Sequence, residues 1–368
     1  MNIPFMRLDR QFQQHKEAIL TLCEDVFSHG RVLQGPEVTA LEKQLAIVMG
    51  TRYAIAVGSA TDALFFALIS AGMQPGDRVA VPAMTFVATV TPVIRAGGTP
   101  VFVDASIDYQ PDITKTIQLV ETGSVEAVVM AHLYGQMFDI TPLAEACKSN
   151  NVLLIEDAAQ AIGATLKESK PGEKSAAAVL SFDPMKIAGA YGSGGAVVTN
   201  DSQIKKRVDR LRYHGRDENR TYQELGYNSQ MASLQAAIVG FKIDHLDEWT
   251  KRRQQIARLY KSELEKVSNI ILPRENPESN HVFHKFVITS GNKRNHLRYH
   301  LKQAGIETMI HYRSSLNSEP LFSKYLTAES SFAEAERISR EALSLPIYPE
   351  LTDLEVGYIC EHITDFKW

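Results

Sequence analysis

Two stretches of the chain, VLLIEDAAQAIG (Val152–Gly163) and AAAVLSFDPMKIAGAYGSGGAVVT (176–199), decide the fold. Each contains a short apolar run that is typical of a buried β-strand, and each run ends in polar residues. Asp157 follows the first run, Val152–Ile155, and Lys186 follows the second, Ala177–Phe182. Ligands of open α/β sheets bind beyond the carboxyl ends of the strands. The two stretches therefore predict an active site that contains a carboxylate and a lysine.

Strand-like and helix-like segments alternate at short spacing before and after these stretches. Apolar runs predict further strands at Tyr53–Val57, Arg78–Pro82, Thr99–Asp104, Val125–His132 and Ala196–Thr199. Helical periodicity separates them, for example in Ile113–Val120, Pro142–Asn150 and 201–214. This alternation predicts an α/β fold, with a mostly parallel sheet that helices cover on both faces.

The pattern changes toward the C-terminus. Residues Ser229–Val267 are predicted to form one long, increasingly charged helix, of the kind that commonly bridges two domains. Beyond it, strands are expected at Val282–Thr289 and Glu307–Ile310, and helices at His296–Ala304, about 330–343 and 353–363. We therefore expect a large domain of residues 1–245, with an N-terminal helical segment, and a smaller α+β domain of residues 246–368.

Composition excludes several classes of protein. The 368 residues are 44% hydrophobic and 22% charged, as in a soluble globular protein, and the net charge of −4 gives no reason to expect nucleic acid or a membrane as partner. No apolar run is long enough for a spanning helix, and the N-terminus lacks an apolar signal core. The three cysteines, Cys23, Cys147 and Cys360, show no metal-ligand or disulfide spacing. We expect a cytoplasmic protein without a metal.

The remaining chemistry centres on Lys186 and Asp157, because the dinucleotide, Walker and Gly-x-Ser-x-Gly motifs are absent in the required context. A buried lysine attacks carbonyls when its pKa is lowered. Pyridoxal phosphate (PLP) chemistry needs such a lysine for a Schiff base, and a carboxylate that keeps the pyridine nitrogen protonated. Lys186 could instead be a surface lysine, and Asp157 a helix cap. Neither alternative explains why both residues follow hydrophobic strands.

Three further sites, the segment Ser59–Thr61 and the single residues Phe86 and Ser181, have two interpretations each. Ser59, Ala60 and Thr61 stand where a strand meets a helix N-terminus, so they could bind a phosphate, or Ser59 or Thr61 could only cap the helix. Phe86 could stack on a flat ring or pack in the core. Ser181 could bind phosphate or be a hydrogen-bonded core hydroxyl.

Many segments of the chain resemble the sugar aminotransferases of the DegT/DnrJ/EryC1/StrS family, which have the aspartate aminotransferase fold (PLP fold type I). The matching segments keep the family's order and span nearly the whole chain: GPEVTALEK, VGSATDALFFAL, GDRVAVPAMTFVATVTPV, TPVFVD, HLYGQMFDI, IEDAAQAIGA, SFDPMKIAGAYGSGGAVVTND, LGYNSQMASLQAAI and LSLPIYPELTD.

The resemblance assigns a role to each candidate. Lys186 would be the Schiff-base lysine and Asp157 the partner of the pyridine nitrogen. Gln160 would contact the ring hydroxyl and Phe86 would stack on the ring, while Ser59, Ala60, Thr61 and Ser181 would hold the phosphate. Asn228 would reach the phosphate of a neighbouring subunit, which implies a homodimer with shared active sites; alternatively, it is a turn residue. Substrate contacts are expected at His311, Tyr312 and Arg313.

The implied activity is transfer of an amino group from L-glutamate to a nucleotide-linked keto-deoxysugar, in the biosynthesis of amino sugars such as those of O-antigen (lipopolysaccharide). The sequence Gly-Ser-Gly-Gly at 192–195 resembles members that act at C3 of the sugar and often carry Gly-Asp-Gly-Gly. The alternatives are a C4-specific aminotransferase, a PLP-dependent sugar dehydratase, and a non-catalytic PLP-binding regulatory protein. The dehydratases carry histidine at the position of Lys186, which counts against them.

The chain departs from the family pattern at three places. Asp183 stands where His, Tyr or Phe is usual, Tyr348 stands where histidine is frequent, and HYRSSLNSEPLF (311–322) replaces the usual HYPxPLH. Arg313 and Asn317 in that segment could contact substrate or be loop residues. These departures bear on sugar specificity more than on the chemistry.

Overall fold

A seven-stranded sheet forms the centre of the computed structural model, which describes residues 1–326 and 331–368. In space the strands follow the order β1 (Tyr53–Val57), β8 (Gly195–Thr199), β7 (Ala177–Ser181), β5 (Leu153–Asp157), β4 (Ala127–Ala131), β2 (Arg78–Pro82) and β3 (Thr99–Val103). Strand β8 is antiparallel to both of its neighbours, and the pairs from β7 to β3 are parallel. The predicted α/β fold with a mostly parallel sheet is confirmed.

Helices cover both faces of the sheet because its strands are apolar on both sides. One face packs against α4 (Ala60–Ser70), α5 (Thr91–Arg95) and α8 (Ser202–Arg212). The other packs against α3 (Pro36–Met49) and α9 (Ser233–Asp244) at one end and against α6 (Ile113–Glu121) and α7 (Thr141–Ser149) at the other. Strand β1 shows the period of two: Ile55 and Val57 face the first group of helices, and Ala54 and Ala56 face α3.

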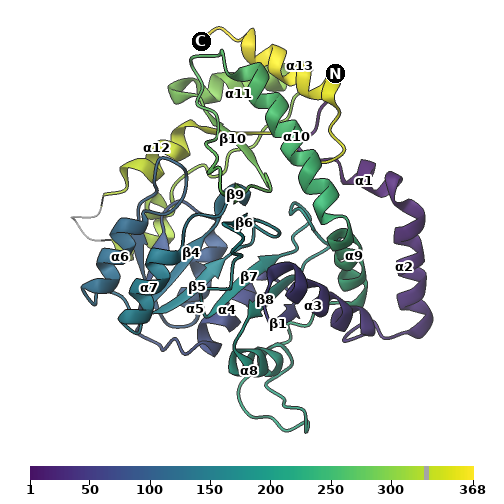
Figure 1. The fold of residues 1–368 in the computed structure, drawn as a ribbon, viewed down its shortest axis with the longest axis vertical. Coiled ribbons are helices and arrows are strands. Elements are labelled where there is room, and N and C mark those ends of the chain that lie inside the picture. The colour runs from purple at the N-terminus through teal and green to yellow at the C-terminus, as the bar shows by residue number, and fades with distance from the viewer. Residues whose placement is uncertain (327–330) are drawn as a thin grey trace.

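The C-terminal elements lie together above the sheet, next to both chain termini (Figure 1). They are α10 (Leu246–Leu264), β10 (Phe286–Thr289), α11 (Arg294–Gln303), β11 (Ala342–Leu345) and α13 (Asp353–Thr364), with β10 and β11 paired antiparallel. Helix α12 (Ala333–Glu341) returns to the side of the sheet, and β6 (Thr165–Leu166) pairs with β9 (Ser279–Asn280). At the N-terminus, α1 (Leu8–Gln14) and α2 (Lys16–His29) form an outer flank.

The single long helix expected over Ser229–Val267 is wrong, because α9 and α10 are separate helices that meet at His245. The imidazole Nδ1 of His245 lies 2.9 Å from the carbonyl oxygen of Phe241, and the ring packs against the rings of Phe241 and Trp249. These contacts fix His245 at the junction, where its backbone angles (φ −98°, ψ 2°) leave the helical region.

The strand predictions in the C-terminal part need two further corrections. The segment Glu307–Ile310 forms only an isolated bridge between Met309 and Ser344. The strand expected from Val282 begins at Phe286, because the N–H groups of Val282 and Lys285 donate to Gly135 and Tyr134. Strand β10 pairs with β11, and β11 begins inside the helix predicted at 330–343. Residue 330 of that predicted helix is outside the described residues.

The hydrophobic cores suggest how the two expected domains are connected. Ile3 belongs to the C-terminal core, where it bridges to Ile306. Conversely, Phe322 and Phe332 pack on Phe102 in the core of the sheet. We therefore propose the division at residue 245 together with two exchanged segments, one at the N-terminus and one inside the C-terminal part, which contains Phe322 and Phe332.

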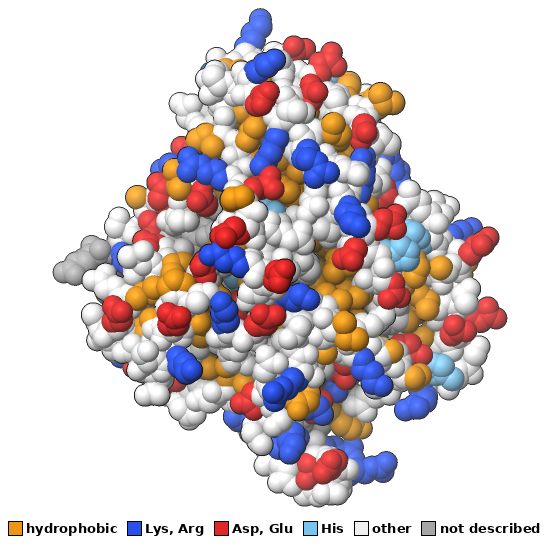
Figure 2. Space-filling model, in the orientation of Figure 1, with side chains coloured by type: hydrophobic (Ala, Val, Ile, Leu, Met, Phe, Trp, Pro, Cys, Tyr) orange, Lys and Arg blue, Asp and Glu red, His pale blue; other side chains and the backbone are white. Residues whose placement is uncertain are grey.

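On the face that Figure 2 shows, neither sign of charge dominates. Figure 2 shows acidic and basic side chains interspersed on one face, with hydrophobic side chains between them. Within residues 1–326 and 331–368, none of the helices combines the length and the apolar character that a membrane span requires.

Candidate active site

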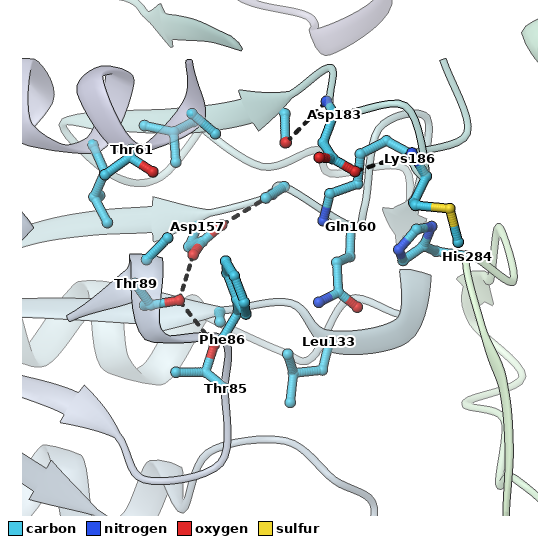
Figure 3. A pocket seen from close by; sticks show the side chains of 18 of the residues that line it. Thr61, Thr85, Phe86, Thr89, Leu133, Asp157, Gln160, Asp183, Lys186 and His284 are labelled. Atoms are coloured by element: carbon cyan, nitrogen blue, oxygen red, sulfur yellow. Dashed lines mark hydrogen bonds between the residues drawn. The ribbon is translucent and has the colours of Figure 1, made fainter. Parts of the chain in front are cut away.

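A cavity of about 310 Å³ opens at the carboxyl ends of β4, β5 and β7. Its walls come from both parts of the fold: the N-terminus of α4 and the loops after β2, β5 and β7 on one side, and residues 284–285 and 309–312 on the other. Figure 3 shows the side chains of Lys186 and Asp157 pointing into the same space, with Thr61 at one end and His284 at the other. The expected meeting of a lysine and a carboxylate at this edge of the sheet is found.

Asp157 is the last residue of β5, and its carboxylate is held on both oxygens. Oδ2 accepts a hydrogen bond of 2.7 Å from the hydroxyl of Thr89, and Oδ1 accepts one of 3.0 Å from the N–H of Ala159. The hydroxyl of Thr89 also lies 2.8 Å from that of Thr85 (Figure 3). These contacts fix the orientation of the carboxylate relative to the cavity.

Lys186 lies in a tight turn after β7. Its N–H donates to the carbonyl of Asp183 at 2.8 Å, and the Asp183 carboxylate accepts from the N–H of Met185 at 3.0 Å. The unusual residue Asp183 therefore orders the turn that carries the lysine. Burial lowers the pKa of Lys186, and the negative charges of Asp157 and Asp183 oppose that shift. A lysine in this environment has a larger share of the neutral, nucleophilic amine than a surface lysine has.

The N-terminus of α4 forms the end of the cavity where a phosphate was expected. The Ser59 hydroxyl caps the helix by accepting from the N–H of Asp62 at 3.1 Å, and Ser59 also lines the cavity. The first intrahelical bond runs from the N–H of Ala63 to Ser59, so the N–H groups of Ala60 and Thr61 precede the helix's own ladder. A Cβ on Gly195 would lie 2.4 Å from the nitrogen of Ala60, so only glycine lets β8 approach this turn.

Gln160 and Phe86 both line the cavity, and Tyr312 is a neighbour of each. The Gln160 amide accepts from the N–H of Tyr134 at 2.9 Å and donates to the hydroxyl of Tyr312 at 3.0 Å. Phe86 remains 54% exposed, and its ring lies 5.9 Å from that of Tyr312. An exposed aromatic ring in a cavity wall is available for stacking, whereas a core role would have buried it.

Not every predicted site residue lines the cavity. Ser59, Ala60, Thr61, Ser181, His311 and Tyr312 do, together with the residues described above. Asn228 and Arg313 do not; Asn228 pairs with Tyr213 outside the cavity. Tyr348 is buried in the C-terminal core.

Several residues of the site were missed from the sequence. Thr85 and Thr89 lie four positions apart in the segment that follows β2, a spacing that could have indicated a shared hydroxyl pair. Tyr134, His284 and Lys285 gave no signal, because only the tertiary fold brings residues 133–135 and 282–285 together.

Two histidines, His284 and His311, lie on the side of the cavity formed by residues 284–285 and 309–312. Burial lowers the pKa of His311 to about 3 and that of His284 well below its usual value, and the charges of Lys186 and Lys285 add to both shifts. Both imidazoles are therefore neutral at physiological pH. Among the residues that line the cavity, Lys186 and Lys285 are the two that carry an amine.

The donors and acceptors of the cavity fit pyridoxal phosphate. An oriented carboxylate suits the protonated pyridine nitrogen, an amine of lowered pKa suits a Schiff base, and the half-exposed Phe86 suits the ring face. Gly195 lets β8 lie close to the N-terminus of α4. The backbone N–H groups at this N-terminus suit a phosphate.

Comparisons with known proteins agree with this arrangement. Residues 13–364 match the DegT/DnrJ/EryC1/StrS aminotransferase family. A "pleiotropic regulatory protein" of Geobacillus stearothermophilus is 38% identical over 100% of this chain and 99% of its own length. The dTDP-3-amino-3,4,6-trideoxy-α-D-glucose transaminase of Streptomyces venezuelae is 34% identical, over 95% of this chain and 92% of its own. The structure of NtdA from Bacillus subtilis with bound cofactor PMP aligns with a TM-score of 0.90 at 29% identity, over 98% of this chain and 84% of that one.

Proposed function

The chain belongs to the DegT/DnrJ/EryC1/StrS aminotransferase family, and on that premise we propose that it is a PLP-dependent aminotransferase that moves an amino group onto a nucleotide-linked keto sugar. The observation that carries the proposal is the pair formed by Lys186 and Asp157, which point into one cavity at the carboxyl edge of the sheet. The resemblance alone would allow a chain that had lost its chemistry, but this chain keeps both groups and the hydrogen bonds that orient them.

The cofactor, when bound, supplies an electron sink for the carbon that gains or loses nitrogen. The protein supplies the proton transfers and the positions. Lys186 would hold the cofactor through its amine, and the same amine, when free, would carry a proton to and from the reacting carbon. Asp157, fixed by Thr89 and Ala159, would keep a positive charge on the ring nitrogen. The α4 N-terminus and Ser181 would bind the phosphate, and Phe86 would pack on the ring face.

We assign the amino donor as L-glutamate and the acceptor as a 3-keto sugar. The preference for C3 is supported by Gly-Ser-Gly-Gly at 192–195 and by a relative whose name describes a 3-amino sugar. A C4-specific enzyme is the alternative that the same cavity allows.

A regulatory protein that binds PLP without turnover is the second candidate, because one relative is named a pleiotropic regulatory protein. Lys186 would hold PLP in either case, so the turnover assay below separates the two candidates.

The test combines substrate screening with one variant. The purified protein is loaded with PLP and glutamate and offered dTDP-, UDP- and GDP-linked 3-keto and 4-keto sugars, and mass spectrometry identifies the sugar that gains an amine. The variant Lys186→Arg is expected to remain folded and to lose turnover. Substantial turnover in that variant, or no aminated product with any sugar, would contradict the proposal.

A further inference from the structure

A second lysine lies in the wall of the cavity. Lys285 directly precedes β10, its N–H donates to the carbonyl of Tyr134 at 3.2 Å, and its side chain lines the same cavity as Lys186. The residue is only 5% exposed. A buried ammonium is costly unless an acidic or otherwise polar partner compensates its lost hydration.

Within the described residues, the Lys285 amine has an aromatic neighbour but forms no ion pair with an acidic side chain. Its nitrogen lies 4.9 Å from the centre of the Phe5 ring, a contact that favours a cation without neutralising it. Among the ion pairs of residues 1–326 and 331–368, none includes Lys285. Burial, reinforced by the charges of Lys186 and Arg253, lowers the pKa of Lys285 to about 7, while the charge of Asp183 opposes the shift.

The other charged groups that line the cavity have tasks of their own. Asp157 is engaged by Thr89 and Ala159, and Asp183 accepts from the N–H of Met185. Lys186 is the residue that holds the cofactor. Of the charged groups that line the cavity, Lys285 is therefore the one without an assigned role. An anion that binds in the cavity would supply a negatively charged partner for its amine.

We propose that Lys285 binds a carboxylate of the amino donor, which is a dicarboxylic amino acid. This inference rests on the proposed function, since only an aminotransferase has such a donor. The donor's α-carboxylate is bonded to the carbon that carries the reacting amine, so it must lie near Lys186. The phosphates of a nucleotide-linked sugar are attached at C1, at least two ring bonds from a keto group at C3. A lysine that lines the same cavity as Lys186 therefore fits the donor's carboxylate better than the nucleotide's phosphates.

The experiment uses two probes that cannot react. Glutarate carries the two carboxylates of glutamate without its amine, and glutaramide has the same shape without charge. Their dissociation constants for the PLP-loaded protein are measured by calorimetry in wild type and in Lys285→Met, which keeps the apolar stem and removes the charge. The Met variant is expected to bind glutarate about 10- to 100-fold more weakly, as loss of a charge-assisted hydrogen bond predicts, and to bind glutaramide unchanged. Lys285→Arg is expected to restore most of the glutarate affinity.

Lys242→Met is the matched control. Lys242 is likewise buried, at 1% exposure, with its nitrogen 4.6 Å from the ring centre of Tyr191, but it does not line the cavity. This control variant is expected to bind glutarate as the wild type does. If Lys285→Met does not fold, Lys285→Gln, which keeps a donor without the charge, replaces it.

The affinities for dTDP and UDP are measured in the same way. Two results would overturn the inference: unchanged glutarate affinity in a folded charge-free variant, or a loss of affinity that is seen only with dTDP or UDP. The second result would assign Lys285 to the nucleotide. A failure of the proposed function looks different, because wild-type protein would then not convert its bound cofactor with any amino acid, whatever the glutarate measurements give.

Discussion

At the scale of single residues, Thr89 is the side chain that donates a hydrogen bond to Asp157, the carboxylate that we assign to the ring nitrogen. Thr89→Val removes the 2.7 Å hydrogen bond to Asp157 and leaves the side-chain volume nearly unchanged. A hydrogen bond to a charged group contributes about 1.5–3 kcal/mol, so we expect the first-order rate of the glutamate half-reaction to fall about tenfold or more. Stopped-flow absorbance of the bound cofactor measures that rate.

Thr85→Val is the control for this prediction. Thr85 contacts the hydroxyl of Thr89 but not the carboxylate, so its removal is expected to slow the half-reaction less. An equal loss in both variants would show that the hydroxyl pair acts as a unit, and no loss in Thr89→Val would show that the backbone contact from Ala159 is sufficient.

Lys242 gives a prediction for stability against pH. Burial lowers its pKa to about 8 from an ordinary value of 10.5. The charged form therefore opposes folding, with full effect below pH 8, and the penalty disappears as the pH rises toward 10.5. Lys242→Met is expected to raise the melting temperature by a few degrees at pH 7, by roughly 1–2 °C per kcal/mol recovered in a chain of this length, and to lose that advantage above pH 10.5. Calorimetric melting curves across this range measure the difference. A gain that is the same at every pH would indicate improved packing and not a relieved charge.

At the scale of elements, the strands of the large sheet could be predicted because each is a short apolar run between helical segments. The sequence could not show that β11 pairs with β10, because Ala342–Leu345 continues the periodic pattern of the helix before it. The split at His245 was equally hidden, since no proline or glycine marks it and the ring contacts that fix it are tertiary.

Some residues of the candidate site could likewise be predicted from the sequence, and others could not. Lys186, Asp157 and Gln160 are close to strand ends, so local pattern and resemblance found them. Thr89 contacts Asp157 and Lys285 contacts Phe5, which are distant in the sequence, and only the folded chain brings these residues together.

The junction of β8 with the α4 N-terminus yields a prediction about phosphate binding. In Gly195→Ala the added Cβ would lie 2.4 Å from the nitrogen of Ala60, so the turn that presents its N–H groups must move. We expect the affinity for PLP to fall at least tenfold, by the loss of one or more N–H contacts to a charged group. Equilibrium dialysis of apoprotein with PLP measures it. Gly192→Ala is the control, since its Cβ would meet only the movable side chain of Gln235, at 3.2 Å; a comparable loss there would contradict the assignment.

At the scale of the whole molecule, the exposed apolar side chains are informative. Leu20, Phe27, Val32 and Leu33 are each at least half exposed on the N-terminal flank formed by α2 and the loop after it. Exposed apolar side chains on one flank favour an interface. It supports the proposal of a homodimer, in which Asn228, which lies outside its own subunit's cavity, reaches the phosphate of the other subunit.

Mixing two inactive variants tests whether the active sites are shared. Lys186→Ala removes the amine from its own cavity, and Asn228→Ala removes the proposed phosphate contact from the partner's cavity. In a heterodimer of the two, one cavity would combine the intact Lys186 of one subunit with the intact Asn228 of the other. Random exchange of subunits is therefore expected to restore roughly a quarter of the wild-type turnover, because half of the dimers are mixed and each has one complete site. Each variant alone, unfolded and refolded in the same way, is the control. If the mixture is no more active than the sum of its parts while size-exclusion chromatography shows that the subunits have exchanged, Asn228 serves its own subunit or none, and the sites are not shared.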